Sequence, residues 1–418
     1  MRILMLAPQP VLEPRGTPIS VYQRLVALSA LKHEIDLVTY HLGDEVEIPG
    51  VTVHRIPAVP FIKEVKPGPS LPKVLLDCLL FGKALILLCT RQYNVIHAHE
   101  EAAFFAILLA FLFDVRHLYD MHSSLPRQLG AFGFARKSPI RWLFKVMERW
   151  VLHTCDAVIT VSLALQEHVQ TINPAVKQVM IENLPVHAEV PPQDSEPSAK
   201  ITSLGLDSGY LVVYTGTFEP YQGLDLLLQC AKIVSSRRPD VQFLMVGGRQ
   251  NQVDYWRSEA RRLDLNGNIR FTGIVPIQEV GGYVRMAHIL VSPRKNGLAT
   301  PLKIYDYMAA GKPIVATNIE AHASVLNPDM ALLVDCTAEA LATGILELMD
   351  KPEQAEALGL RAQEHAQEHF RFADYIAKVN AIYQTLHDAQ PAAGPDYPYS
   401  TPLNTNSLGQ QRIPTARE

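Results

Sequence analysis

The sequence lacks several short motifs that by themselves indicate a class of protein. Its five cysteines are scattered and none forms a CxxC pair, which argues against a zinc site or a disulfide framework and favours a reduced, cytosolic setting. No GxGxxG segment is present, so a Rossmann enzyme that transfers hydride has no support. No DxD-like acidic cluster stands out at a turn, so we predict no bound metal and no cofactor.

Membrane-spanning and strongly charged segments are also missing. The first ten residues, MRILMLAPQP, lack the length and cleavage site of a signal peptide. The longest apolar run, Ala102–Phe113, is too short to cross a bilayer and predicts a buried helix. A formal net charge of −4 lacks the basic excess of a nucleic-acid binder. We therefore expect a soluble cytoplasmic protein without a nucleic-acid partner, and contact with a membrane surface stays open.

The 418 residues are 48% hydrophobic, which is enough for two domain cores. Short β-rich runs alternate with helical patterns, and this predicts α/β domains with doubly wound parallel sheets. A segment rich in Pro, Glu and Ser interrupts the pattern, which then starts again. The predicted parts are a first domain (1–185), a linker (186–200), a second domain (201–370), a helix that crosses back to the first domain (371–388) and a disordered tail (389–418).

The most informative stretch is SPRKNGLATPLKIYDYMAAGKPIVAT, residues 292–317. It predicts a strand, a loop and a helix from Leu302 to Ala310, with Thr300 as N-cap and Pro301 at the first helical position. The free N–H groups at such a helix start favour an anion such as phosphate. Lys303 lies in the first turn, where a cation opposes the helix dipole, so a nearby bound anion would explain it. A surface pair of Lys303 with Asp306 is the plain alternative.

This stretch resembles the retaining family 4 glycosyltransferases, which use nucleotide-sugars and have the GT-B fold of two Rossmann-like domains across a cleft. Their signature is a Glu, seven residues and a second Glu, followed by a small-residue helix end with Gly-x-Pro. Asp306 stands at the second acidic position, whereas the first falls on Leu298. The resemblance implies that Asp306 holds the ribose of the donor. It also implies that backbone N–H groups around Thr300 and Leu302 cradle the diphosphate.

The segment VYTGTFEPYQG resembles the strand and glycine turn with which that family clamps the diphosphate. The positions of the two family cations hold Thr217 and Gln222 here, next to the turn residue Gly216 and before Gly223. We predict that Arg294 and Lys303 supply the missing charge in catalysis. Further along, NIRFTGIVP resembles the turn that meets the nucleobase, which implies contacts from Gly273 and Ile274.

The first domain carries a less specific resemblance. Its segment PRGTPIS resembles the N-terminal glycine loop of the family, with Gly16 in a turn and Thr17 as a cap; we place both with His99 at the acceptor and phosphate loop. The family has a functional histidine near the transferred sugar, and the resemblance carries this role to His122. His97 and His99 share a strand face and could form a metal site with Glu100, but without a clear third ligand a structural role is the better prediction.

A basic-aromatic segment, FGFARKSPIRWLFKVMERW, spans residues 132–150. Arg141, Lys145 and Arg149 repeat at i, i+4 and line one helix face, flanked by Trp142 and Trp150. Such helices rest on anionic membranes, but an ordinary amphipathic helix with a solvated basic face fits equally well.

Together these features predict a glycosyltransferase that moves a sugar from a nucleotide-diphosphate sugar to an acceptor hydroxyl. The resemblance implies a retaining, metal-independent hexosyltransferase that acts on a sugar or lipid-linked acceptor in cell-envelope glycan or glycolipid synthesis, cytoplasmic or peripheral on the inner membrane face. Three alternatives stay open. They are a nucleotide-sugar epimerase of the same fold, a protein that only binds nucleotide-sugars, and a two-domain binding protein of periplasmic type.

Overall fold

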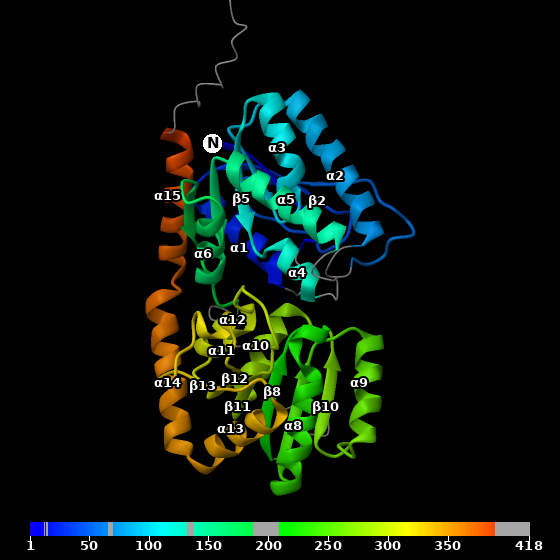
Figure 1. Ribbon diagram of the computed structural model, residues 1–418, viewed down its shortest axis with the longest axis vertical. Helices are drawn as coiled ribbons and strands as arrows, with labels where there is room; N and C mark the ends of the chain where they lie inside the picture. Colours follow the sequence, from blue (N-terminus) through cyan, green and yellow to red (C-terminus); the bar gives the residue numbers. More distant parts are fainter. Residues whose placement is uncertain (12, 14–15, 66–69, 132–137, 187–208, 389–418) are drawn as a thin grey trace, which may run out of the picture.

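The computed structural model describes residues 1–418 except 12, 14–15, 66–69, 132–137, 187–208 and 389–418. It contains two parallel-sheet α/β domains stacked along the long axis of the molecule (Figure 1). Within these described residues, no helix is both long and apolar enough to cross a membrane. The predicted linker from residue 187 onwards and the predicted tail lie outside the described residues.

The first domain has a seven-stranded parallel sheet in the order β3-β2-β1-β4-β5-β6-β7. Its strands are β1 (Arg2–Ala7), β2 (Glu34–Thr39), β3 (Val51–Arg55), β4 (Val95–His99), β5 (Arg116–Met121), β6 (Ala157–Thr160) and β7 (Lys177–Met180). Its helices are α1 (Gly16–Ala30), α2 (Leu71–Thr90), α3 (Ala102–Phe113), α4 (Leu125–Ala131), α5 (Pro139–Thr154) and α6 (Leu163–Ile172). The central strands are buried on both faces, as apolar runs in a doubly wound sheet require.

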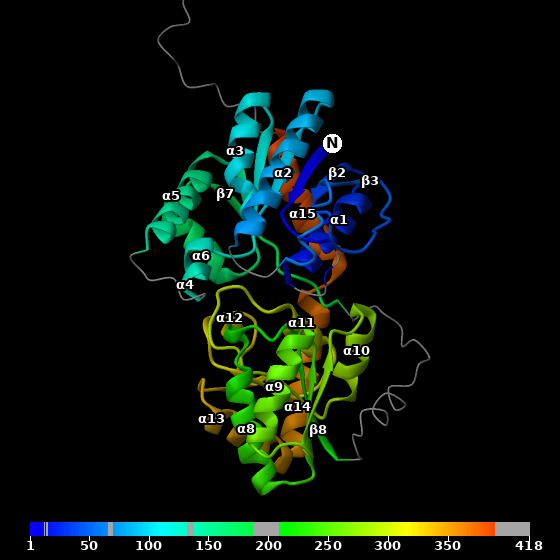
Figure 2. The ribbon, with the colours of Figure 1, turned by 90° about the vertical axis from the view of Figure 1, so that its right-hand side faces the viewer.

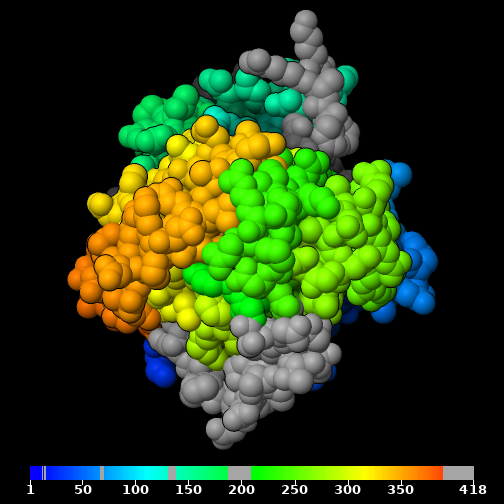
Figure 3. Space-filling model, turned by 90° about the horizontal axis from the view of Figure 1, so that it is seen from below, coloured from blue at the N-terminus to red at the C-terminus, as the bar shows by residue number. Residues whose placement is uncertain are grey.

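The second domain has a six-stranded parallel sheet in the order β10-β9-β8-β11-β12-β13. Its strands are β8 (Tyr210–Thr215), β9 (Val241–Val246), β10 (Ile269–Gly273), β11 (Ile289–Ser292), β12 (Ile314–Thr317) and β13 (Leu332–Val334). Its helices are η1 (Pro220–Gln222), α8 (Leu224–Arg237), α9 (Gln250–Arg262), α10 (Ile277–Met286), α11 (Leu302–Ala309), α12 (Glu320–Ala323), α13 (Ala338–Asp350) and α14 (Pro352–His369). Seen from below, the orange residues of α13 and α14 cover this domain beside the green α8 (Figure 3).

The last described helix, α15 (Phe372–Asp388), returns to the first domain. Its apolar side chains Tyr375, Val379, Ile382 and Tyr383 join the core that α1 forms under the first sheet. Helix α14, directly before it, packs on α11 of the second domain. The two helices run along one side of both domains (Figures 1 and 2), so the C-terminal part of the chain ties the two sheets together.

Helix α3 differs in part from its predicted burial. Its N-terminal half is buried, but Leu108, Phe111 and Leu112 near its C-terminal end are exposed. A helix that is apolar on all sides must leave one face uncovered when it packs on only one face of a sheet. The prediction of a fully buried helix is therefore wrong for this end.

Candidate functional site

A cavity of about 390 Å³ lies between the two domains. Its walls come from the loops that follow the strands of both sheets: Gln9 after β1, His122 after β5, Gly216 after β8 and Arg294 after β11. Ligands of parallel α/β sheets bind at this carboxyl edge. The volume is in the range of small-molecule sites, so the cavity is the candidate active site.

Most residues predicted for the site line this cavity. They are Gly16, Thr17, His122, Gly216, Thr217, Gln222, Ile274, Arg294, Thr300, Leu302, Lys303 and Asp306. Gly273 is not among the lining residues; its carbonyl accepts from the backbone of Gly247 and from the Thr272 hydroxyl. Of the two residues predicted to contact the nucleobase, Ile274 lines the cavity and Gly273 does not.

Two cations form the centre of the second-domain wall. The Lys303 ammonium lies 3.8 Å from the ring centroid of Tyr214 and 3.4 Å from Gln222 Oε1. Arg294 stacks over Tyr221 and donates from Nε to the carbonyl of Asn296. Neither cation has a carboxylate partner among the described residues. Burial, and then repulsion by Arg294, hold the pKa of Lys303 well below its ordinary value.

Gly216 explains how Lys303 reaches the cavity. Its φ of +135° is a conformation that favours glycine, and a Cβ placed there would lie 2.8 Å from Lys303 Nζ. The glycine of this turn therefore makes room for the cation. Lys303 and Arg294 thus line the same wall as Thr217 and Gln222, and their role in place of the two family cations stays a prediction.

The start of α11 corrects one local prediction. The helix begins at Leu302, and Pro301 with its extended ψ of 133° is the N-cap. Thr300 is not the cap, because its hydroxyl bonds that of Ser324 instead. Asp306, one turn into the helix, accepts the backbone N–H of Val186 at 2.6 Å, so it also holds the chain where it leaves the first domain.

Leu298 occupies the place of the first family acid. It packs against the core of the first domain, and its carbonyl accepts from the Ser162 hydroxyl at 3.0 Å. The position of the first family acid is therefore occupied by a contact between the two domains.

The first-domain wall carries His122, which is buried except where it meets the cavity. Burial lowers the pKa of His122 to about 4, although Asp120 opposes this, so the ring is neutral at pH 7. His99 was predicted at the acceptor loop, but it is fully buried behind His122, with its Nδ1 3.0 Å from Nε2 of that ring. The reason is that β4, which ends at His99, is buried along its whole length.

The loop after β1 also differs from its prediction. Gly16 is the first residue of α1 and Thr17 the second, so neither forms a turn or a cap before the helix. Both still line the cavity, because the N-terminal end of α1 points at it.

Two carboxyl groups of the first-domain wall were not predicted to line the site: Glu100 was weighed only as a possible metal ligand, and Glu101 was given no role. Glu100, which follows β4 with a φ of +48°, accepts from the Ser123 hydroxyl. Burial and the neighbouring Glu101 raise the pKa of Glu100 to about 8. Glu101 itself pairs with Lys73 across the cavity wall. The signal in the sequence was the pair of acids directly after a short strand, VIHAH, that ends in a histidine.

His97, His99 and Asp120 have ligand atoms within 4.8 Å of one another, as a metal site would need. The Arg24 guanidinium, however, lies 2.9 Å from Asp120 Oδ2. Both nitrogens of His97 are hydrogen-bonded, one to Asp120 and the other to Tyr383. A buried cation at the same carboxylate disfavours a metal ion, so the cluster is best described as a hydrogen-bonded network.

Two family models match the chain. The model "Glycosyl transferase 4-like domain" covers residues 15–183, and "Glycosyl transferases group 1" covers residues 209–351. A phosphatidyl-myo-inositol mannosyltransferase of Mycolicibacterium smegmatis is 27% identical over 184 residues, which are 43% of this chain and 46% of that protein. The chain thus spans about half the length of the curated relatives it matches first.

Solved structures with the same architecture cover nearly the whole chain. A sucrose-phosphate synthase from Thermosynechococcus elongatus has a TM-score of 0.80 at 20% identity and covers 93% of this chain and 100% of its own. The Anabaena protein Alr3699/HepE in complex with UDP-glucose has a TM-score of 0.72 at 16% identity and covers 92% of this chain and 100% of its own. These structures confirm the predicted GT-B fold.

Proposed function

The chain belongs to the family-4-like glycosyltransferases of the GT-B fold, and from that premise we propose that it transfers a sugar from a nucleotide-diphosphate sugar to an acceptor hydroxyl. The observation that carries this proposal is the pair of cations, Lys303 and Arg294, that face the cavity without a carboxylate partner among the described residues. A diphosphate supplies the charge that they lack, and charge-assisted bonds to a leaving phosphate stabilise the transition state.

We propose a reaction that needs neither a metal ion nor a cofactor and that retains the anomeric configuration. The two cations and the start of α11 can neutralise the leaving diphosphate, which is the task that a metal performs elsewhere. The retaining outcome follows the family resemblance. It is tested by the anomeric coupling of the product in a proton NMR spectrum, and the metal requirement by turnover in a chelator.

A glycolipid acceptor at a membrane surface is the substrate class that we infer. On the first domain, apolar side chains of α2, α3 and α5 are exposed, among them Leu71 (87%), Phe111 (77%) and Trp142 (67%). Helix α3 packs against both α2 and α5, so the three helices that carry these side chains lie side by side (Figure 2). Exposed Lys145 and Arg149 on α5 add positive charge beside the apolar surface. Such a face fits an anionic lipid surface on the domain that receives the acceptor.

The direct test supplies the full-length protein with a panel of nucleotide-sugars and extracted glycolipid acceptors. Transfer of labelled sugar to the lipid fraction supports the proposal. Conversion of the donor sugar without any acceptor would indicate an epimerase. Tight donor binding with neither transfer nor hydrolysis would indicate a protein that only binds nucleotide-sugars.

The membrane inference has its own test with vesicles. We expect co-sedimentation with anionic liposomes at low salt and loss at high salt, because each basic residue near such a surface contributes about 1 kcal/mol. The variant Arg141→Glu/Lys145→Glu/Arg149→Glu should not sediment. The matched control Arg257→Glu/Arg261→Glu/Arg262→Glu reverses three exposed charges on α9 of the second domain and should sediment like the wild type. Equal sedimentation of both variants would contradict the proposed docking face.

A further inference from the structure

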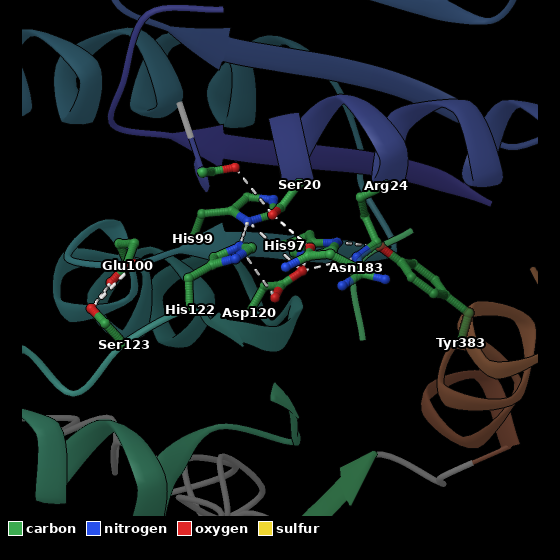
Figure 4. A network of polar contacts seen from close by, with 11 residues as sticks. Ser20, Arg24, His97, His99, Glu100, Asp120, His122, Ser123, Asn183 and Tyr383 are labelled. Carbon is green, nitrogen blue, oxygen red and sulfur yellow. Dashed lines mark hydrogen bonds and ion pairs between the residues drawn. The ribbon is translucent and has the colours of Figure 1, made fainter. Parts of the chain in front are cut away.

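A buried polar network lies behind His122 in the first domain (Figure 4). It joins side chains from four elements: Arg24 of α1, His97 and His99 of β4, Asp120 of β5, and Tyr383 of α15. All are almost fully buried. Asp120 lies at the centre, since Arg24, His97 and His122 all approach its carboxylate.

One oxygen of Asp120 accepts hydrogen bonds from two other buried side chains of the network. Its Oδ2 accepts from Arg24 Nε at 2.9 Å and from His97 Nε2 at 3.1 Å. His97 Nδ1 in turn accepts from the Tyr383 hydroxyl at 2.6 Å. These contacts fix the carboxylate. Burial alone would raise the pKa of Asp120, but Arg24 and the nearby histidines hold it well below its ordinary value.

The other oxygen faces the ring of His122. Asp120 Oδ1 lies 3.4 Å from His122 Nε2, and His99 Nδ1 lies 3.0 Å from the same nitrogen. If Nε2 carries the proton, it donates to His99 and lies favourably beside the carboxylate. If His99 donates instead, the lone pair of Nε2 is held against an anionic oxygen, which is repulsive. His99 Nδ1 lies farther from the carboxylate, 3.7 Å from Asp120 Oδ2, so the closer approach of His122 favours the proton on its Nε2.

We propose that Asp120 is a positioning residue that keeps the proton of His122 on Nε2, so that the ring presents an unprotonated Nδ1 to a hydroxyl group of the sugar in the cavity. Among the described residues Nδ1 has no hydrogen-bond partner, and His122 lines the cavity. The low pKa of the buried ring agrees, because a neutral imidazole carries a single proton. The role toward a sugar rests on the proposed function, whereas the tautomer does not.

The tautomer can be read directly from the free protein. Imidazole nitrogens with and without a proton have well-separated chemical shifts in ¹⁵N–¹H correlation spectra of protein labelled at histidine. The spectrum of His122→Gln identifies the signals of His122. We expect the Nε2–H form in the wild type at pH 7; the Nδ1–H form would overturn the proposal.

Asp120→Asn should move His122 toward the Nδ1–H form, because an amide N–H can donate to Nε2. This variant leaves Arg24 without its carboxylate, so Arg24→Met/Asp120→Asn serves as a second variant without an unpaired charge. The control Tyr375→Phe alters a buried tyrosine of α15 whose hydroxyl has no partner among the described residues, and it should leave the tautomer unchanged. An unchanged Nε2–H form in the folded Asp120 variants would overturn the proposal.

Activity gives an independent reading. If the chain transfers sugar as proposed, the Asp120 variants should lower kcat at least tenfold while nucleoside diphosphate affinity stays within twofold. The spectra contain no substrate, so a failure of the proposed transferase function would leave the tautomer result intact, and the two failures are distinguishable.

Discussion

The two walls of the cavity balance their buried charges in opposite ways. In the first domain, Arg24 pairs with Asp120 and Lys73 with Glu101, so each buried cation has an acid of its own. In the second domain, Lys303 and Arg294 have only aromatic rings and neutral groups as partners among the described residues. The two cations of the first wall are paired without a ligand, whereas Lys303 and Arg294 of the second wall have no acidic partner among the described residues until an anion binds. A preorganised first-domain wall thus faces a second-domain wall that a bound anion would stabilise.

Breaking the ion pair of the first wall has the largest expected effect on stability. Arg24→Met leaves Asp120 buried without its cation, and loss of one partner of such a pair costs about 3–5 kcal/mol. Urea unfolding followed by circular dichroism measures the loss. An exposed ion pair contributes at most about 1 kcal/mol to the free energy of unfolding. A loss below that value would show that Asp120 does not depend on Arg24 as a buried partner.

Removing a cation from the second wall should leave the stability of the free protein intact and weaken ligand binding instead. Lys303→Met takes away a buried charge without an acidic partner, so the free energy of unfolding of the free protein should not fall. Nucleoside diphosphate affinity should drop by roughly 10- to 150-fold, because a bond to a charged group contributes about 1.5–3 kcal/mol. Titration calorimetry and urea unfolding of the same variant test both parts. If Lys303→Met is destabilised and its nucleoside diphosphate affinity is unchanged, Lys303 has a structural role and does not bind the diphosphate.

Asp306 lies where the two walls meet, and we expect its replacement to weaken nucleotide binding less than the replacement of Lys303. Asp306→Asn keeps an oxygen for the N–H of Val186 but removes the charge toward the predicted ribose hydroxyls. Because neutral hydrogen bonds are about half as strong as charged ones, we expect roughly tenfold weaker nucleotide binding with an unchanged melting temperature. If nucleoside diphosphate binds Asp306→Asn and the wild type equally, the predicted ribose contact is wrong.

The smallest effect is a pH dependence. Burial holds the pKa of Lys303 below its unfolded value of 10.5, so between these two pKa values the unfolded chain binds a proton that the folded chain does not. The contribution of Lys303 to stability therefore becomes less unfavourable as pH rises toward 10.5. Relative to Lys303→Met, the wild type should gain stability from pH 7 to pH 9.5 in parallel melting curves. A difference that is constant with pH, or one that grows in favour of the variant, would contradict this.

Much of the fold and of the donor side could be predicted from the sequence. Alternating strands and helices indicate two doubly wound sheets, and motif residues such as Lys303 and Asp306 lie close to the loop that they identify. Such features can be predicted because neighbouring residues determine where a strand, a turn or a helix begins.

The first-domain wall depends on contacts between distant parts of the chain, which no local pattern encodes. Arg24 and Asp120 are 96 residues apart, and His97 and Tyr383 are 286 apart. The one local signal was an acid, Asp120, inside a strand whose other central residues are apolar or aromatic. His99 was misplaced for the same reason: its spacing indicated a strand face but not which layer of the domain that face meets.

The most direct test of the unpaired donor wall compares ligands with and without phosphate. Titration calorimetry of the wild type with each nucleoside diphosphate and with its parent nucleoside should show one diphosphate binding at least 100-fold more tightly than the nucleoside, and Lys303→Met should lose most of that difference. A nucleoside that binds as tightly as its diphosphate would contradict the claim that Lys303 and Arg294 await an anion.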